Sequence, residues 1–428
     1  MPLVIIILTI ISIIVSILFF PTIKIKNLTI STYWPIALIG ALLLIVTNSI
    51  DLNVIANSFT SNDSLNPIKI LVLFISMTIL SIFLDEVGFF KYVATKAASL
   101  LNGSQTKLFI GFYLLISILT IFTSNDIIIL TFTPFICYYA KNSKINPIPY
   151  LIAEFIAANT WSMALIIGNP TNIYLASAFE IGFLEYLSYM FFPTLAASIC
   201  SFGILYLIFR KKLQEKMSPT SENEEVTLDK GLLIIGLIHL ITTTVLIAIS
   251  SYIEGLEMWI ITLSFVISLV ICTSIYLLIR KRSFKILLNT FKRGPYALIP
   301  FVLSMFVIVL TLTSEGITST IYEFLNNLPS VFSFGFGGAI LANFINNIPM
   351  SVLFANMSIT SESAIYASII SSNIAAYITP VGALAGIMWM SLLKTYDVKL
   401  SFKKFVGYGV TIGIPTLLIA LLTLFIII

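Results

Sequence analysis

The stretch Thr123-Ser124-Asn125-Asp126 interrupts a chain that is otherwise almost continuously apolar, and Gly168-Asn169-Pro170-Thr171-Asn172 interrupts it again one segment later. The second half of the chain repeats this pair, with Asn346-Asn347-Ile348-Pro349 first and Thr379-Pro380-Val381-Gly382 after it. Lipid cannot satisfy bare backbone groups, so a helix broken at membrane depth persists only where protein or a water-filled cavity lines it. Corresponding interruptions in two halves of a chain are typical of the binding site of a secondary transporter.

The composition indicates a membrane protein, because hydrophobic residues make up 58% of the 428 residues and charged residues only 10%. The first apolar segment, 3–20, lacks a basic start and a small-residue cleavage site, so we expect a retained helix and not a signal peptide. We expect one polytopic domain in the plasma membrane. Apolar segments of about 20 residues, enough to cross a bilayer, recur near 3–20, 69–84, 191–209, 231–250, 258–279, 296–313 and 406–428.

The charged residues divide the connections between these segments into two classes. By the positive-inside rule the basic connections are cytoplasmic, and those rich in acids are expected outside; Lys69 alone lies outside the basic groups. Because the basic residues are spread over loops, the net charge of +4 does not indicate nucleic-acid binding. The basic groups lie at 24–26, 91–107, 141–144, 210–230, 280–293 and 394–404, and the acidic ones at 51–66, 180–185, 254–257, 315–323 and 358–362.

This charge map predicts a hairpin in the first half of the chain. The limbs 108–122 and 127–140 both end at basic connections, so both ends are expected on the cytoplasmic side. Each limb has about 14 apolar residues, or about 21 Å of helix, which is short for a full span. A re-entrant hairpin over 108–140, with Ser124-Asn125-Asp126 at its tip, satisfies both observations. A broken helix over 148–179 is expected to follow it.

The second half repeats this pattern with the opposite orientation. A hairpin over 331–357 has both ends at acidic connections, and a broken helix over 364–393 then leads to Lys394. The predicted fold is therefore an all-α polytopic membrane protein, an inverted-repeat transporter with two re-entrant hairpins and two broken transmembrane helices. Its expected parts are a first repeat with its leading helix over 1–210, a cytoplasmic linker over 211–230 and a second, inverted repeat over 231–428.

Several motifs resemble the arsenical pump membrane proteins, and the similarity runs in order over nearly the whole chain. The motifs are Leu84-Asp85-Glu86-Val87-Gly88-Phe89-Phe90, Ser124-Asn125-Asp126, Thr133-Pro134, Ile181-Gly182-Phe183-Leu184-Glu185-Tyr186, Asn346-Asn347-Ile348-Pro349, Ile378-Thr379-Pro380-Val381-Gly382-Ala383-Leu384-Ala385 and Trp389. The superfamily that this resemblance implies also contains citrate and divalent-anion carriers and sodium/proton antiporters. It implies an elevator-type carrier and, as the leading function, efflux of arsenite or antimonite coupled to the proton gradient.

Three departures keep an alternative open. Asn159 and Asn373 stand where the arsenical pumps usually carry an aspartate, and 168–172 is more similar to the Gly-Asn-Pro stretch of carboxylate carriers. A citrate, dicarboxylate or other anion carrier, or a sodium/proton antiporter, is the alternative within the superfamily. A channel or a membrane receptor is the alternative outside it, and only a transporter would accumulate substrate against a gradient.

The candidate site is built from the interruptions themselves. Asp126 is the acid expected deep in the membrane, where it would carry a coupling proton, help bind sodium, or cap the helix that follows it. Asparagine offers an amide oxygen to a cation and amide hydrogens to an oxyanion or a hydroxyl. The candidate substrate and ion ligands are Ser124, Asn125, Asp126, Asn159, Asn169, Thr171, Asn172, Asn346, Asn347, Asn373, Thr379 and Gly382, and the candidate helix breaks are Pro170 and Pro380.

Other reactive side chains have ordinary explanations. Cys137, Cys200 and Cys272 have no motif spacing and are expected to be apolar packing residues, His239 to pack between helices, and Glu154 to lie at the cytoplasmic interface. Phosphate-loop, metal-ligand and Ser–His–Asp patterns are missing, so we expect no enzyme, no metal and no cofactor. The expected partners are a small inorganic or organic ion, a coupling proton or sodium, and the lipid bilayer; a homodimer and a partner ATPase are compatible with this class.

Overall fold

The computed structural model describes residues 1–25, 28–62, 66–101, 103–218, 227–250, 252–253, 255–357 and 359–428. Part of the predicted linker 211–230 and parts of three predicted external connections lie outside these residues. Seven described helices are long and apolar enough to cross a membrane, or eight if α14 and α15, which are bent by 79°, form one span. The chain is a multi-pass helical membrane protein.

The elements of the first half begin with a helix and a small β-hairpin. They are α1 (Pro2–Phe19), β1 (Thr22–Ile25), β2 (Leu28–Ser31), α2 (Tyr33–Val46), α3 (Leu52–Thr60), α4 (Pro67–Val87), α5 (Phe89–Leu100), α6 (Gln105–Phe122), α7 (Asn125–Asn142), α8 (Ile148–Trp161), η1 (Ile166–Gly168), α9 (Pro170–Ala178), α10 (Phe183–Phe209) and η2 (Lys212–Gln214).

The second half ends in the same order of elements as the first. Its elements are α11 (Lys230–Ser250), α12 (Met258–Ile279), α13 (Lys285–Lys292), α14 (Leu298–Ser314), α15 (Ile317–Asn326), α16 (Ser330–Ile345), α17 (Asn347–Ala355), α18 (Glu362–Ile374), η3 (Ala375–Tyr377), α19 (Leu384–Thr395) and α20 (Phe402–Ile427).

Both halves share a local signature at the start of this order. Helices α4 and α14 each end next to a left-handed glycine, Gly88 with φ 89° and Gly316 with φ 74°, and a short helix follows directly. Glycine adopts this conformation without the steric cost that a side chain would add. In each half, two helices joined by a tight tip come next, then two helices separated by a 3₁₀ turn, then a long helix.

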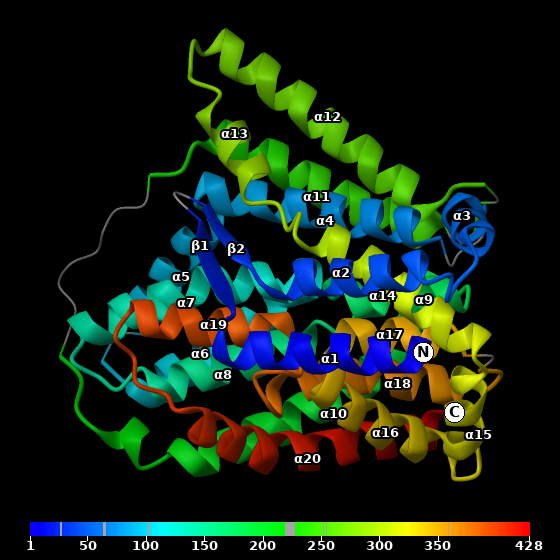
Figure 1. Cartoon of the computed structure of the whole chain (residues 1–428). Helices are drawn as coiled ribbons and strands as arrows, with labels where there is room; N and C mark the ends of the chain where they lie inside the picture. The colour runs from blue at the N-terminus through cyan, green and yellow to red at the C-terminus, as the bar shows by residue number, and fades with distance from the viewer. Residues whose placement is uncertain are drawn as a thin grey trace.

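The helices form two neighbouring groups in Figure 1. One group packs α10 along α20, α16 along α18 and α6 along α8, and the other packs α2 with α14 and α4 with α11 and α12. The two chain ends lie together at one side of the molecule, and the β1–β2 hairpin lies toward the opposite side (Figure 1). Outward apolar side chains such as Ile267, Ile271 and Ile275 on α12 are exposed, as a lipid-facing helix requires.

Two expectations about local structure need correction. The segment after α1 is not purely helical, because Thr22–Ile25 and Leu28–Ser31 pair as antiparallel strands. These strands are rich in threonine and isoleucine, which favour extended backbone. The first hairpin limb is also longer than predicted, since α6 has 18 residues and is apolar enough to span. The polar residues 105–107 begin this helix, with Ser104 as its N-cap, and an apolar count omitted them.

Candidate functional site

Both hairpin tips and both helix breaks meet at one cavity of about 220 Å³. Four helices begin at it, α7, α9, α17 and α19, and their first residues line it. Further lining residues come from α4 and from the chain leading into α14. The helix starts contribute Asn125, Asp126, Asn169, Pro170, Asn347, Ile348, Ala383, Leu384 and Ala385, and the other segments include Phe74, Thr78, Ile82, Arg293 and Leu298.

The first tip joins α6 to α7 and binds α8. The Asn125 Nδ2 donates to Asn159 Oδ1 at 3.0 Å, and Asn159 Nδ2 donates to the Phe155 carbonyl at 2.8 Å. Ser124 is the N-cap residue of α7, but within the described residues its buried hydroxyl has no hydrogen-bond partner. The N-cap residue Ser124 makes no capping bond, and Asn125 Oδ1 accepts from the Asp126 N–H at 2.9 Å, so Asp126 is not the cap of α7. Its carboxylate lies in the first turn and lines the cavity.

The first break is held by asparagines that replace lost backbone bonds. Asn169 caps α9 by accepting from the Thr171 N–H at 3.2 Å, and Pro170 follows at the first helical position, where its missing N–H costs nothing. Asn172 Nδ2 donates to the carbonyls of Ser162 at 2.7 Å and Leu165 at 3.2 Å. The Ser162 carbonyl is one that the end of α8 leaves open, while the Leu165 carbonyl also accepts from the Gly168 N–H at 3.1 Å.

Glycine lets the chain fold back over the helix end at both breaks. A Cβ on Gly168 would lie 2.2 Å from the Ser162 carbonyl oxygen, and a Cβ on Gly382 would lie 2.2 Å from the Ala375 carbonyl oxygen. Pro380 lies within the second of these turns. Because backbone atoms, and not flexible side chains, would be struck, neither position accepts a larger residue without moving the break.

The second tip is held against the second break. Asn346 adopts φ 78°, caps α17 through the Ile348 N–H at 3.2 Å, and donates to the Val381 carbonyl at 3.0 Å. The backbone N–H of Asn347 donates to the Gly382 carbonyl at 3.0 Å. A non-glycine residue at such a φ is strained, and this strain is maintained by the contacts around the tip.

Asn373 connects the two halves of the chain. Its Oδ1 accepts from Ser162 Oγ at 2.8 Å and Asn169 Nδ2 at 2.9 Å, and its Nδ2 donates to Asn172 Oδ1 at 2.6 Å. An ionised aspartate could accept the first two bonds but could not donate the third. Asn373 is therefore a cross-link behind the cavity. Thr171 and Ser372 add a second link, with 3.0 Å between their hydroxyl oxygens.

The structure thus brings the predicted residues together in two layers. Asn125, Asp126, Asn169, Pro170 and Asn347 line the cavity. The others lie behind it or at its tips and turns: Ser124, Asn159, Thr171, Asn172, Asn346, Asn373, Thr379, Pro380 and Gly382.

Several residues that support the site were not predicted from the sequence. Ser162 and Ser372 serve the break network, and a signal existed in the polar run Ser371-Ser372-Asn373 within an apolar helix. Asn343 lies beside Gly382, and its buried Oδ1, like the buried Thr379 hydroxyl, has no hydrogen-bond partner among the described residues. Such open oxygens are suited to a ligand or a cation.

Arg293, the cation at the rim of the cavity, is neutralised by two acids. Arg293 donates to Asp85 at 2.6 Å and to Glu86 at 2.6 Å, and Thr131 on α7 donates to the other Asp85 oxygen at 2.8 Å. The ion pairs found in the described residues include none with Asp126. The cavity therefore holds one carboxylate without a cationic partner.

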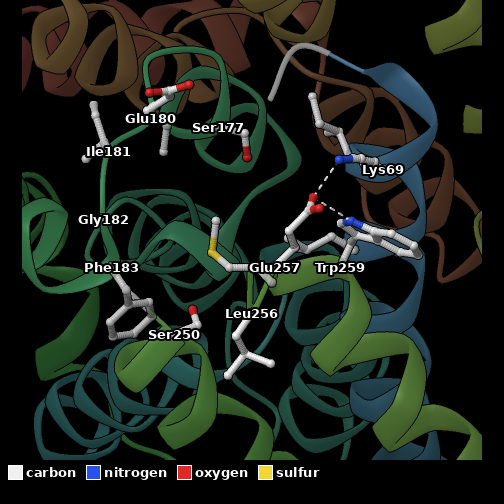
Figure 2. A pocket seen from close by; sticks show the side chains of 14 residues that line it. Lys69, Ser177, Glu180, Ile181, Gly182, Phe183, Ser250, Leu256, Glu257 and Trp259 are labelled. Carbon is white, nitrogen blue, oxygen red and sulfur yellow. Dashed lines mark hydrogen bonds and ion pairs between the residues drawn. The ribbon is translucent and has the colours of Figure 1, made fainter. Parts of the chain in front are cut away.

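A second cavity, of about 250 Å³, lies between the α9–α10 turn and the ends of α4, α11 and α12. Figure 2 shows Lys69 and Trp259 converging on Glu257, while Glu180 comes from the α9–α10 turn. Lys69 Nζ lies 2.7 Å from Glu257 Oε2, and the Trp259 indole donates to the same oxygen at 2.8 Å. This pair explains why Lys69 departs from the basic connections: an acid of a predicted external connection neutralises it.

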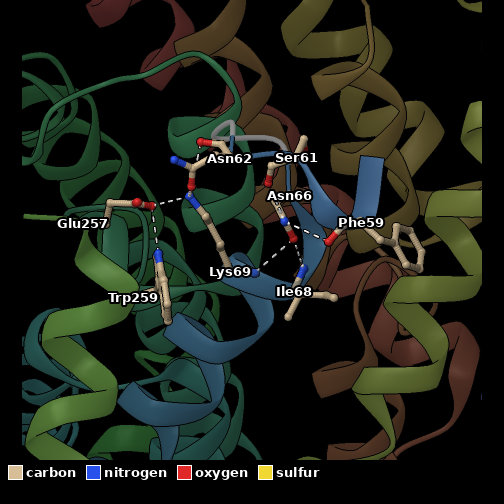
Figure 3. A network of polar contacts seen from close by, with 8 residues as sticks. All are labelled: Phe59, Ser61, Asn62, Asn66, Ile68, Lys69, Glu257 and Trp259. Atoms are coloured by element: carbon tan, nitrogen blue, oxygen red, sulfur yellow. Dashed lines mark hydrogen bonds and ion pairs between the residues drawn. The ribbon is translucent and has the colours of Figure 1, made fainter. Parts of the chain in front are cut away.

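The start of α4 fixes this lysine. Asn66 caps α4 through the N–H of Ile68 at 2.9 Å and donates to the carbonyls of Phe59 and Ser61 (Figure 3). Lys69 also donates to Asn62 Oδ1 at 2.7 Å. Burial opposes ionisation of Glu257, but the bonds from Lys69 and Trp259 and the charge of Lys69 outweigh it and lower the pKa of Glu257.

His239 packs between α11 and α12 as expected, where it bonds to Ser268 and to the Ile235 carbonyl. The described residues contain no group of three or more His, Cys, Asp or Glu side chains that could hold a metal. Glu154 is fully buried, because α8 packs against α6, α7 and α10, and its expected place at the cytoplasmic interface stays a prediction.

A multi-pass helical protein in which two hairpin tips and two helix breaks enclose one cavity, lined in part by asparagines and a carboxylate, belongs to the class of membrane transporters. The chain is a member of the citrate transporter family (CitMHS) of the ion transporter superfamily, whose model matches residues 3–368. Family membership places it among transporters and not enzymes.

Related proteins and a solved structure agree with this assignment. The arsenical pump membrane proteins of Yersinia enterocolitica and Escherichia coli K12 are 27% and 28% identical, each over 82% of this chain and 84% of theirs. The putative arsenical pump membrane protein of Bacillus subtilis is 25% identical over 91% of this chain and 93% of its own. The crystal structure of the YdaH transporter of Alcanivorax borkumensis has the same fold, with a TM-score of 0.60 at 13% identity over 99% of this chain and 98% of that one.

Proposed function

We propose that the chain is a secondary active transporter of the plasma membrane that exports arsenite or antimonite in exchange for protons. The single observation that carries the transporter mechanism is the convergence of both hairpin tips and both breaks on one cavity. Helix ends exposed in this way supply backbone N–H groups and open carbonyls at membrane depth, where a substrate or coupling ion can use them.

The proposal includes an inverted repeat. The shared order of elements after Gly88 and after Gly316 supports two repeats, and the charge map supports opposite orientations. On this map the cavity at the hairpin tips, here named the inner cavity, has Arg293 at its rim and opens toward the cytoplasm. The cavity at Lys69 and Glu257, named the outer cavity, opens outside. Single cysteines at Ser218 and Ser283 should react with an impermeant thiol reagent from the cytoplasm, and a cysteine at Ser361 from outside. Reaction of positions 218 and 361 from the same side would rule out the inverted arrangement.

The chemistry of the cavity suits arsenite. Arsenite at neutral pH is a small uncharged trihydroxide, which needs amide and hydroxyl partners and no strong cation. The amides of Asn125, Asn169 and Asn347 in the lining each use one N–H in a bond within the protein and keep a second N–H for a substrate. The positive charge of Arg293 is already paired with acids. The relatives named as arsenical pumps support the same substrate.

One observation favours a citrate, dicarboxylate or other anion carrier as the second candidate. Helices α7, α9, α17 and α19 all begin at the cavity, and helix N-termini favour negative charge. A sodium/proton antiporter remains the third reading of the same superfamily.

The test is transport in cells, followed by binding. Expression in an arsenite-sensitive host should raise arsenite tolerance, whereas Asn125→Ala, expressed at the same level, should not. Purified protein should gain thermal stability with arsenite and not with citrate, succinate or sulfate. Unchanged tolerance with the protein present in the membrane, together with stabilisation by a carboxylate, would replace arsenite by an anion as the substrate.

A further inference from the structure

Glu154 is an acid that the proposed site leaves without a role. It lies in α8, has no exposed surface, and does not line the cavity. Its carboxyl accepts from the hydroxyl of Thr133 on α7, and the indole N–H of Trp389 on α19, which has no hydrogen-bond partner among the described residues, is its other polar neighbour. No charged group of the described residues acts on it, and no ion pair there includes it. Cys137 on α7 is a titratable neighbour.

The hydrogen bonds fit a neutral carboxylic acid. Thr133 Oγ1 lies 2.9 Å from Glu154 Oε1 and 3.1 Å from Oε2. A hydroxyl has one hydrogen to donate and two lone pairs to accept with, so a full hydrogen bond to each of these oxygens needs a second hydrogen. The second contact is satisfied when the carboxyl carries a proton and donates it to the hydroxyl. An ionised carboxylate without a cation would be costly at this depth.

This acid is tied to the hairpin tip through two helices. Helices α7 and α8 are joined at the tip by Asn125 and Asn159, and joined again further along by Thr133 and Glu154. Loss of the Glu154 proton would remove one donor from the second link and leave a buried charge between the helices. The charge would favour any arrangement of α7 that admits water to the carboxyl.

We propose that Glu154 is a proton-binding site of the transporter, distinct from Asp126, whose release of a proton is linked to movement of the α6–α7 hairpin. In the step, the carboxyl O–H bond breaks, the proton passes to water on the side that has gained access, and a carboxylate remains. Rebinding of a proton restores the bond to Thr133 and closes the α7–α8 contact. The proposal rests on the proposed transport function only in its link to hairpin movement.

The first experiment needs no substrate. Infrared spectra of purified protein, compared between the wild type and each variant, detect a protonated carboxyl by its carbonyl stretch. At neutral pH the spectrum should contain a band that disappears in Glu154→Gln, persists in Asp126→Asn, and shifts in Thr133→Val, where the hydroxyl partner is lost. Glu323→Gln, which removes an exposed acid on α15, is the matched control. If the neutral-pH spectrum holds no band that depends on Glu154, the proton site is overturned whatever the substrate is.

The second experiment tests the link to transport in proteoliposomes. Glu154→Gln resembles the protonated acid in shape, so it should fold and exchange substrate, but its net transport should lose most of its dependence on an imposed pH gradient. Thr133→Val should move the pH profile without abolishing exchange. A band that depends on Glu154 combined with a wild-type pH profile in Glu154→Gln would overturn the link and leave a structural proton. If no variant and no wild-type protein transports arsenite, the substrate proposal fails while the infrared result stands.

Discussion

The two cavities on either side of the α4–α9 contact use their charged groups in opposite ways. The inner cavity receives four helix N-termini and Asp126, whose carboxylate has no ion-pair partner in the described part of the chain. In the outer cavity Lys69 and Glu257 neutralise each other. A small pocket of about 20 Å³ between them is lined mainly by apolar side chains, Phe74 and Tyr174 among them. A carboxylate without a cationic partner is available to bind an ion. The ion pair of Lys69 and Glu257 is already satisfied and serves structure.

The comparison predicts that changes at the two hairpin tips of the inner cavity have the largest effect on transport. Asn125→Ala removes the donor to Asn159, and Asn346→Gly removes the cap of α17 and the bond to Val381 while tolerating φ 78°. We expect transport to fall to background in both variants. The loss of stability should be modest, about 1–3 kcal/mol for each lost buried bond.

The measurement is uptake into proteoliposomes together with a melting curve of each purified variant. Asn346→Ala is expected to be less stable than Asn346→Gly, because alanine is strained at this φ. Asn326→Ala, an exposed change on α15, is the control for removal of an asparagine. Normal transport by either tip variant would take that tip out of the proposed site.

A smaller but more specific effect is expected at Asp126. Asp126→Asn mimics the protonated acid, so gradient-driven net transport should stop while substrate exchange across the membrane continues. If Asp126 binds sodium instead, the same change should weaken sodium stimulation and leave the pH dependence intact. Imposing pH and sodium gradients separately distinguishes the two. Wild-type coupling under both gradients would show that the unpaired carboxylate of the inner cavity has no part in coupling.

These expectations depend on features that the sequence made visible to different degrees. Asparagine and proline inside apolar runs predicted where the tips and breaks lie, because lipid permits such interruptions only at a lined site. The partners of those residues were not predictable, since Asn373 meets Ser162 and Asn169 only after two distant segments pack together. The full burial of Glu154 was not predictable either, because it comes from the packing of α8 against α6, α7 and α10.

In the outer cavity, too, the sequence predicted an unusual residue but not its partner. Lys69 stood out in the sequence as an exception to the charge map, but its partner is Glu257, which is far away along the chain. The position of Lys69 is explained only when Lys69 and Glu257 are seen together in the structure. A single basic residue among acids therefore predicted an ion pair in principle, without indicating which acid forms it.

The smallest effect is expected from breaking this outer pair. Glu257→Gln keeps an acceptor for Trp259 but removes the negative charge beside Lys69, so the loss of stability should be below about 1 kcal/mol for a pair that is partly exposed to solvent.

The pKa of Glu257 is lowered in the folded protein, although burial opposes this, because Lys69 and Trp259 bind the ionised form. The pair therefore contributes stability above the ordinary pKa of glutamate, about 4.3, and loses it as the pH falls through the lowered pKa of the folded state. Melting temperatures measured from neutral to acidic pH should converge for wild type and Glu257→Gln at the acidic end, while transport at neutral pH changes little. A large loss of transport in Glu257→Gln would instead give the outer cavity a part in binding and end the contrast between the two cavities.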